Sequence, residues 1–185
     1  MIVSNRGIVL FVGAMLVGGV AACSAEHSTV SDAMPTGAAS SPAPTSAALS
    51  PAEALKRLDF LAGAWSFTCD DETTGKDVFA WRPDGKVLEN RSTTNLTPGD
   101  NPVVQSNVTL FEYDSSLSQY HVHPEVTTGP GLHGQFNGNA LVVSGLVRDT
   151  YRPNPDGTIT LTVDEPRGST FSPLMVCTMT RDRTL

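Results

Sequence analysis

The stretch Trp65-Ser66-Phe67-Thr68-Cys69 alternates apolar and polar side chains, which is the pattern of a β-strand with one buried face. Near the end of the chain, Met175-Val176-Cys177-Thr178-Met179-Thr180-Arg181 alternates in the same way. In an antiparallel pair the numbers of facing residues have a constant sum. A pairing of Cys69 with Cys177 therefore also brings Trp65 opposite Arg181, on the same face of the sheet. The two cysteines thus predict that the first strand of the domain meets the last one.

Further strands are expected between these two, separated by residues that reverse a chain at low steric cost. The expected strands are 77–82, 86–95, 103–114, 119–123, 131–136, 140–151 and 158–164. The clearest turns are Pro83-Asp84-Gly85, Asn137-Gly138-Asn139 and Asn154-Pro155-Asp156-Gly157. An open meander would leave two exposed edges, which closure removes. We therefore predict an all-β fold, an antiparallel up-and-down barrel of about 8 to 10 strands that closes first to last.

One short helix is predicted before the first strand. In Ser50-Pro51-Ala52-Glu53 a serine N-cap, a proline at the first helical position and an acid three residues after the serine form a capping box. Apolar residues recur at helical spacing as far as about Ala62, and Gly63 ends the helix. The barrel domain with its N-terminal helix is expected to span residues 50–185, the size of a single domain.

The N-terminus is expected to be a secretory signal of residues 1–22. Arg6 precedes an apolar run from Ile8 to Val20, which is shorter than the roughly 18 to 20 residues of a membrane-spanning helix. The run ends in Val20-Ala21-Ala22-Cys23, which resembles the lipobox of bacterial lipoproteins. That resemblance implies cleavage before Cys23, a lipid such as palmitate on this residue, and a place in the cell envelope outside the cytoplasm. An ordinary cleaved signal and an uncleaved membrane anchor are the alternatives.

Residues 23–49 are rich in Ser, Ala, Pro and Thr, as in Ser40-Ser41-Pro42-Ala43-Pro44. Such a segment cannot bury enough apolar area to offset its ordering entropy, so we expect a disordered tether between lipid and barrel. The formal net charge of the chain is -7, and loss of Arg6 with the signal makes it one unit more negative. This acidity argues against nucleic acid as a partner and against anionic membrane surfaces, which leaves the lipid as the only membrane attachment.

Export also favours oxidation of Cys69 and Cys177 to a disulfide. The loop closed between them is longer than one hundred residues and would contribute roughly 4 to 5 kcal/mol in the chain-entropy model, an upper figure. Two unpaired buried thiols are the alternative.

The segment Gly63-Ala64-Trp65 resembles the G-x-W motif of the calycins, which include lipocalins and fatty-acid-binding proteins. In that group a basic residue from the last strand often packs on the tryptophan, and the resemblance gives this role to Arg181. The phrase Leu58-Asp59-Phe60-Leu61-Ala62-Gly63-Ala64-Trp65 is similar to the opening of nitrobindin-like barrels and of uncharacterised bacterial lipocalin-like lipoproteins. The resemblance implies a calycin-like barrel. The alternative is an ordinary core tryptophan.

The sequence departs from the nitrobindin pattern where haem would bind. Those barrels continue past the tryptophan with glycines and take their haem ligand from a histidine near the C-terminus. Here Ser66-Phe67-Thr68 follows the tryptophan, and the last histidine, His133, lies far from the end. No cofactor is therefore expected.

His121 and His123 are the residues best spaced for a metal. They lie two apart on a predicted strand, so both side chains leave the same face, a geometry that suits two ligands of Zn²⁺ or Cu²⁺. His133 or Glu125 could supply a third ligand, and no spacing rule selects between them. The alternative is a pair of solvated histidines on the outer face, with Val122 pointing inward.

The sequence carries no sign of catalysis. It contains no Gly-x-Ser-x-Gly elbow, no His-Glu-x-x-His motif and no phosphate-cradling glycine loop. We therefore expect a protein that is not an enzyme, and no catalytic residue is assigned.

Small and polar residues in the middle strands predict space inside the barrel, because Leu or Phe would otherwise fill it. The expected function is binding of a small apolar or amphipathic molecule inside the barrel or at its mouth, with Arg91, Tyr113 or Arg148 orienting its polar end. A structural or interaction lipoprotein with a filled barrel is one alternative. A haem- or metal-binding barrel is the other.

Overall fold

A computed structural model describes residues 49–96, 103–126 and 131–182 of this chain. The predicted signal peptide, the lipid attachment at Cys23 and all of the tether except Leu49 lie outside the described residues. The barrel forms one compact unit from Leu49 onward.

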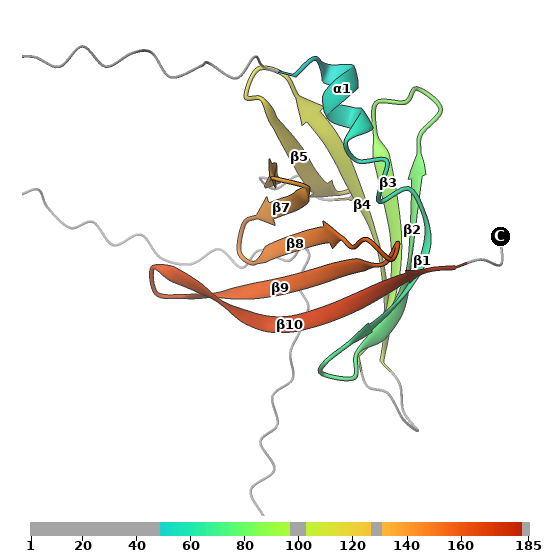
Figure 1. The fold of residues 1–185 in the computed structure, drawn as a ribbon, viewed down its shortest axis with the longest axis vertical. Coiled ribbons are helices and arrows are strands. Elements are labelled where there is room, and N and C mark those ends of the chain that lie inside the picture. The colour runs from blue at the N-terminus through green and yellow to red at the C-terminus, as the bar shows by residue number, and fades with distance from the viewer. Residues whose placement is uncertain (1–48, 97–102, 127–130, 183–185) are drawn as a thin grey trace, which may run out of the picture. The chain divides into compact units, whose positions relative to one another are not determined.

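Ten antiparallel strands form a closed barrel, in which each strand pairs with the next and β1 pairs with β10 (Figure 1). This confirms the predicted all-β, up-and-down barrel closed from first strand to last. The strands are β1 Gly63–Cys69, β2 Thr74–Trp81, β3 Leu88–Asn95, β4 Val104–Asp114, β5 Gln119–Pro124, β6 Leu132–Asn137, β7 Ala140–Ser144, β8 Arg148–Pro153, β9 Ile159–Arg167 and β10 Thr170–Arg181.

The segment 140–151, predicted as one strand, is two. Gly145, Leu146 and Val147 form a tight connection in which the Gly145 N–H donates to the Val147 carbonyl, and Ser144 faces Arg148 across it. A side chain at position 145 would collide with Leu132, since a Cβ there would lie 2.1 Å from that leucine's side chain. Glycine therefore permits a reversal that the continuous apolar pattern concealed.

The helix α1 covers Pro51–Lys56 and is shorter than predicted. Its capping box is complete, because the Ser50 side chain accepts from the Glu53 N–H while the Glu53 carboxylate accepts from the Ser50 N–H. Beyond α1 the chain continues to Ala62 in tight turns with bonds between residues three apart, which replace the predicted helical turns. No helix among the described residues is long and apolar enough to cross a membrane.

The seam between β1 and β10 has the predicted register. Cys177 faces Cys69 and Arg181 faces Trp65. The two cysteines form a disulfide with an S–S distance of 2.07 Å. The first and last strands of the domain are therefore joined by both backbone pairing and a covalent bond.

Candidate functional site

The end of the barrel nearest α1, here called the helix end, is closed by apolar side chains. Leu58 and Leu61, in the turns after α1, have no exposed surface, and the Trp65 Nε1–H donates to the Leu61 carbonyl at 2.7 Å. On β5 the Tyr120 hydroxyl donates to the Ala54 carbonyl at 2.6 Å. These bonds tie the helix segment to the barrel, so the helix end is sealed.

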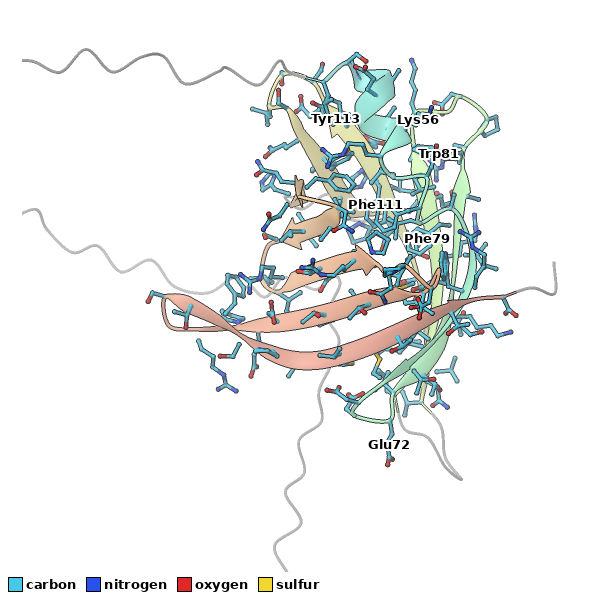
Figure 2. The ribbon with its side chains drawn as sticks, viewed as in Figure 1. Lys56, Glu72, Phe79, Trp81, Phe111 and Tyr113 are labelled. Carbon is cyan, nitrogen blue, oxygen red and sulfur yellow. A yellow bond between two sulfur atoms is a disulfide. The ribbon has the colours of Figure 1, made fainter. Side chains whose placement is uncertain are left out.

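An aromatic group fills the interior below this seal. The ring of Phe79 lies 6.0 Å from that of Phe111 and 6.5 Å from that of Tyr151, between centroids. Figure 2 shows Phe79 and Phe111 inside the barrel, whereas Glu72 lies at the opposite end in the turn after β1. The part of the interior next to the helix end is therefore filled by apolar side chains.

Polar side chains replace aromatic ones one step further from the helix end. Asp77 shares the inward face of β2 with Phe79 and is 5% exposed, and Asn90 on β3 is 7% exposed. The Asn90 Nδ2 donates to the Asp77 carboxyl at 3.5 Å, and Ser92 also hydrogen-bonds to that carboxyl. Burial raises the pKa of Asp77 above its usual value, against the opposite effect of the two hydrogen bonds. The Oδ1 of Asn90 is buried with no hydrogen-bond partner.

A second carboxyl faces the interior from β8. Asp149 shares the face of the buried Tyr151, and it lies opposite Val143 and Val163, both buried. Burial raises the pKa of Asp149 to about 7, and the charge on Asp164 adds to the shift. Burial raises the pKa of the Tyr151 phenol, and the charges of Asp149 and Asp77 raise it further.

Some residues around this polar part of the interior are only partly buried. Ser92, Asp149 and Leu161 all lie on inward faces, yet each keeps part of its surface exposed. In the aromatic group, in contrast, Phe111 is 1% exposed. The polar part of the interior thus includes partly exposed residues, whereas the centre of the aromatic group is buried.

The ionisable side chains of this interior are acids. Among the described residues the buried charged side chains are Asp77 and Asp164, and no lysine or arginine is buried. Asp164 lies on the outer face of β9 and is paired there with Arg148, so Asp77 and Asp149 set the charge inside.

Arg91 and Arg148, predicted to orient a ligand in the interior or at the mouth, lie on the outer face of the barrel. Arg91 alternates with the buried Asn90 on β3 and pairs with Glu89 at 2.5 Å, with 65% of its side chain exposed. Arg148 pairs with Asp164 at 2.7 Å and lies over the ring of Phe171. The alternation of a strand excludes both from the interior, and their role in orienting a ligand stays a prediction.

Tyr113, the third predicted ligand residue, belongs to the helix end. Its ring packs edge-on against Tyr120, 5.3 Å away between centroids, and Figure 2 shows it beside α1. The aromatic group of Phe79 and Phe111 thus separates Tyr113 from Asp77 and Asn90.

Gly63, Trp65 and Arg181, the residues of the G-x-W resemblance, come together at the seam. The Arg181 guanidinium carbon lies 4.5 Å from the centre of the Trp65 ring. Gly63 has a φ of 130°, and a Cβ there would lie 2.4 Å from Arg181 Nη1. The glycine therefore leaves the space in which the guanidinium crosses the tryptophan.

The histidines on β5 and β6 lie outside the barrel. His121 and His123 alternate with the buried Tyr120 and Val122, and His133, which faces His121, is exposed. No histidine of the described segments points into the interior. Glu112, which sequence reasoning did not single out, lies opposite His121 and near His123.

No protein-family model and no curated protein matches this chain. The fold is a closed ten-strand antiparallel barrel, and this architecture is compatible with a calycin-like fold.

Proposed function

We propose that this chain is a non-enzymatic binding protein that holds a small amphipathic molecule inside the barrel. The observation that carries the proposal is the buried, unpartnered Oδ1 of Asn90 beside the carboxyl of Asp77. An unsatisfied buried acceptor costs roughly 1 to 3 kcal/mol. A ligand that donates a hydrogen bond to Asn90 would recover that cost.

The charge of the interior refines the class of ligand. The amide oxygen of Asn90 only accepts, and Asp77 and Asp149 are acids, so the polar end of the ligand should donate hydrogen bonds or carry a positive charge. A fatty-acid carboxylate would meet two acids and no buried cation among the described residues. The apolar part of the ligand would lie against Phe79, which directly faces Asn90 across the β2 and β3 pair.

A purely structural barrel and a haem protein have less support. A purely structural barrel would gain nothing from an orphaned amide oxygen next to a buried acid, since a partly satisfied polar cluster is worse than an apolar core. For haem, His121, His123 and His133 all lie on the outer face, where they cannot reach an iron inside the barrel.

We further propose that the protein is a lipoprotein of the bacterial cell envelope, anchored through a lipid on Cys23 and facing outside the cytoplasm. The sequence Val20-Ala21-Ala22-Cys23 supports the anchor. The disulfide between Cys69 and Cys177 supports an oxidising compartment, because such bonds are rare in the cytosol. The membrane would then be a partner through the lipid alone.

The test of the binding proposal starts from the full chain purified in a mild detergent. Mass spectrometry of a solvent extract should find an amphiphile with an amine or other donor group, retained in a stoichiometric amount. Displacement of an apolar dye by alkylamines should follow. An extract without a bound molecule, together with no dye binding, would favour the structural reading.

A further inference from the structure

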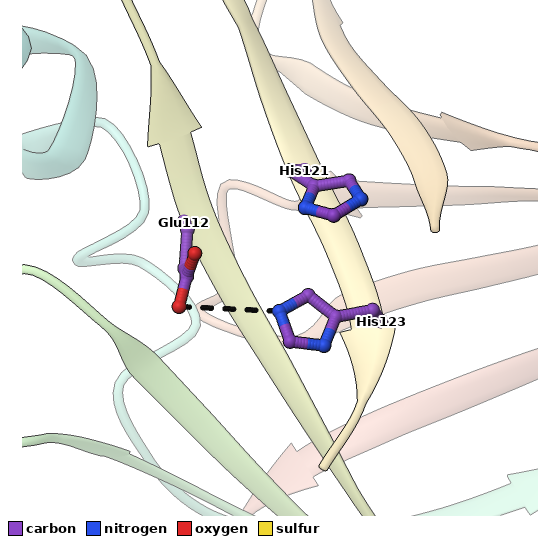
Figure 3. A group of neighbouring side chains, drawn as sticks. All are labelled: Glu112, His121 and His123. Carbon is purple, nitrogen blue, oxygen red and sulfur yellow. Dashed lines mark ion pairs between the residues drawn. The ribbon is translucent and has the colours of Figure 1, made fainter. Parts of the chain in front are cut away.

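Three potential metal ligands gather on the outer face of the sheet, away from the interior site. Glu112 lies on β4, and His121 and His123 lie on β5 (Figure 3). Glu112 faces His121 across the strand pair, and one ligand atom from each of the three residues lies within 4.8 Å of the others. Two imidazoles and a carboxylate therefore converge on one point.

His123 is held with one nitrogen ready for a metal. Its Nδ1 lies 3.1 Å from the Pro124 carbonyl oxygen. Because that oxygen only accepts, Nδ1 carries the hydrogen and Nε2 keeps its lone pair. Nε2 points toward Glu112, 3.9 Å from Oε1 (Figure 3). A backbone carbonyl that fixes the tautomer in this way is the usual second partner of a metal-bound histidine.

The neighbouring ring of His121 is positioned by Gly131. The two imidazole centroids lie 4.9 Å apart, with the rings inclined by 33°. A Cβ at position 131 would lie 2.1 Å from His121 Nε2, so only glycine leaves this ring its place. All three ligands are partly buried, which limits the entropy that they would lose on binding a metal.

We infer that Glu112, His121 and His123 form a binding site for a divalent transition metal of the Zn²⁺ and Cu²⁺ class. Two nitrogens and one carboxylate oxygen match the ligand preference of these ions. Tetrahedral Zn²⁺ with bonds of about 2.05 Å needs ligand atoms about 3.4 Å apart. The Glu112 side chain is 43% exposed and can close the remaining gap, and a water would complete the coordination.

Glu125 and His133, either of which the sequence allowed as a third ligand, are set apart from these three residues. Glu125 is paired with Arg82 at 2.6 Å. The exposed ring of His133 lies 6.5 Å from that of His121, further than the ring of His123. His133 is therefore a matched control, a histidine next to the site that is not a ligand.

The test is a calorimetric titration of the full chain with ZnCl₂, after purification without a histidine tag and removal of metal with EDTA. We expect one Zn²⁺ per chain, and loss of about tenfold or more in affinity in each of His121→Ala, His123→Ala and Glu112→Gln. Cobalt(II) should give the visible bands of a four-coordinate site. His133→Ala should change the affinity by less than about threefold.

Circular dichroism of each variant shows whether the barrel is intact. Glu112→Gln keeps the shape of the side chain, so it tests the site even where an imidazole variant fails to fold. No Zn²⁺ binding by the folded wild type would overturn the inference. An equal loss in His133→Ala and His121→Ala would overturn this set of ligands.

Discussion

Arg181 crosses the face of Trp65 at the seam of the barrel, with its guanidinium carbon 4.5 Å from the centre of the ring. The same guanidinium donates from Nη1 to the Ala62 carbonyl at 3.0 Å. One side chain from the end of β10 thus contacts both the start of β1 and the turns that follow α1. It joins the last strand to the segment that closes the helix end.

Replacement of this arginine should weaken the seam. Arg181→Met keeps the apolar stem but removes the cation, and we expect the free energy of unfolding to fall by about 0.5 to 2 kcal/mol. Urea unfolding monitored by tryptophan fluorescence measures this loss, and the folded-state emission should shift because the charge over Trp65 is gone. The exposed Arg152 supplies the control, Arg152→Met. Equal effects of the two substitutions would show that the contact with Trp65 contributes nothing specific.

The disulfide should be the largest single contribution to the closed seam. Cys69 and Cys177 are separated by 108 residues, and the chain-entropy model gives roughly 4 to 5 kcal/mol as an upper figure for such a loop. We expect the double variant Cys69→Ala/Cys177→Ala to lose a large part of this amount in urea unfolding. Peptide mapping of the non-reduced wild type should yield the crosslinked pair. Recovery of both cysteines as alkylated thiols would contradict the pairing.

The stability of the protein should decrease between about pH 4 and pH 7. The pKa of Asp149 is raised to about 7 by burial, and that of Asp77 is raised in the same direction. In this range the folded state holds protons that the unfolded state has released, so the free energy of unfolding falls as the pH rises. Asp149→Asn removes one such group, so its free energy of unfolding should fall less steeply with pH. Above pH 7 this variant should be more stable than the wild type.

Urea unfolding at a series of pH values measures these slopes. Asp156 is the control, because hydrogen bonds to Thr158 lower the pKa of its exposed carboxyl. Asp156→Asn should leave the decline in place. A wild-type curve parallel to that of Asp149→Asn would mean that Asp149 ionises as freely in the folded protein as in the unfolded chain.

Attachment of lipid at Cys23 can be tested in cells. Growth with a clickable fatty acid should label the wild type, whereas Cys23→Ala should carry no label, because the thiol that accepts the lipid is absent. The double variant Cys69→Ala/Cys177→Ala controls for labelling of other cysteines and should still be labelled. Equal labelling of wild type and Cys23→Ala would rule out this residue as the anchor.

Closure of the barrel could be predicted because its two ends carry strong signals. The cysteines fix one register between Cys69 and Cys177, and the period-two pattern then places Trp65 and Arg181 without further choice. The helix was predicted from its capping box, which acts locally. Its length was not, because tertiary burial of Leu58 and Leu61 determines how the chain turns after α1.

The polar residues of the interior escaped prediction for a physical reason. A polar residue in a strand is by default assigned to the solvent face. It is assigned to the interior only if a residue two positions away on the same strand is recognised as buried, because such residues share a face. Asp77 lies two residues before Phe79, and Asp149 two before Tyr151, so both phases were present in the sequence. The same phase would have placed Arg148 outside.

Glu112 was missed because it becomes a neighbour of His121 only through the β4 and β5 hairpin. That register depends on the turn after Asp114, whose carboxylate accepts bonds from the Ser116 and Leu117 N–H groups. An Asp-Ser-Ser segment signals such a turn. The sequence does not state which residues on either side of it will face each other.

The claim that an acidic, hydrogen-bond-accepting interior binds the ligand is tested most directly with two fluorescent probes that share one alkyl chain and differ in an ammonium or a carboxylate head. The full-length wild type should bind the ammonium probe about tenfold more tightly or better, and Asp77→Asn/Asp149→Asn should remove this preference. Asp156→Asn, an exposed acid, should keep it. Equal affinity of the wild type for both probes, or no binding of either, would contradict the account.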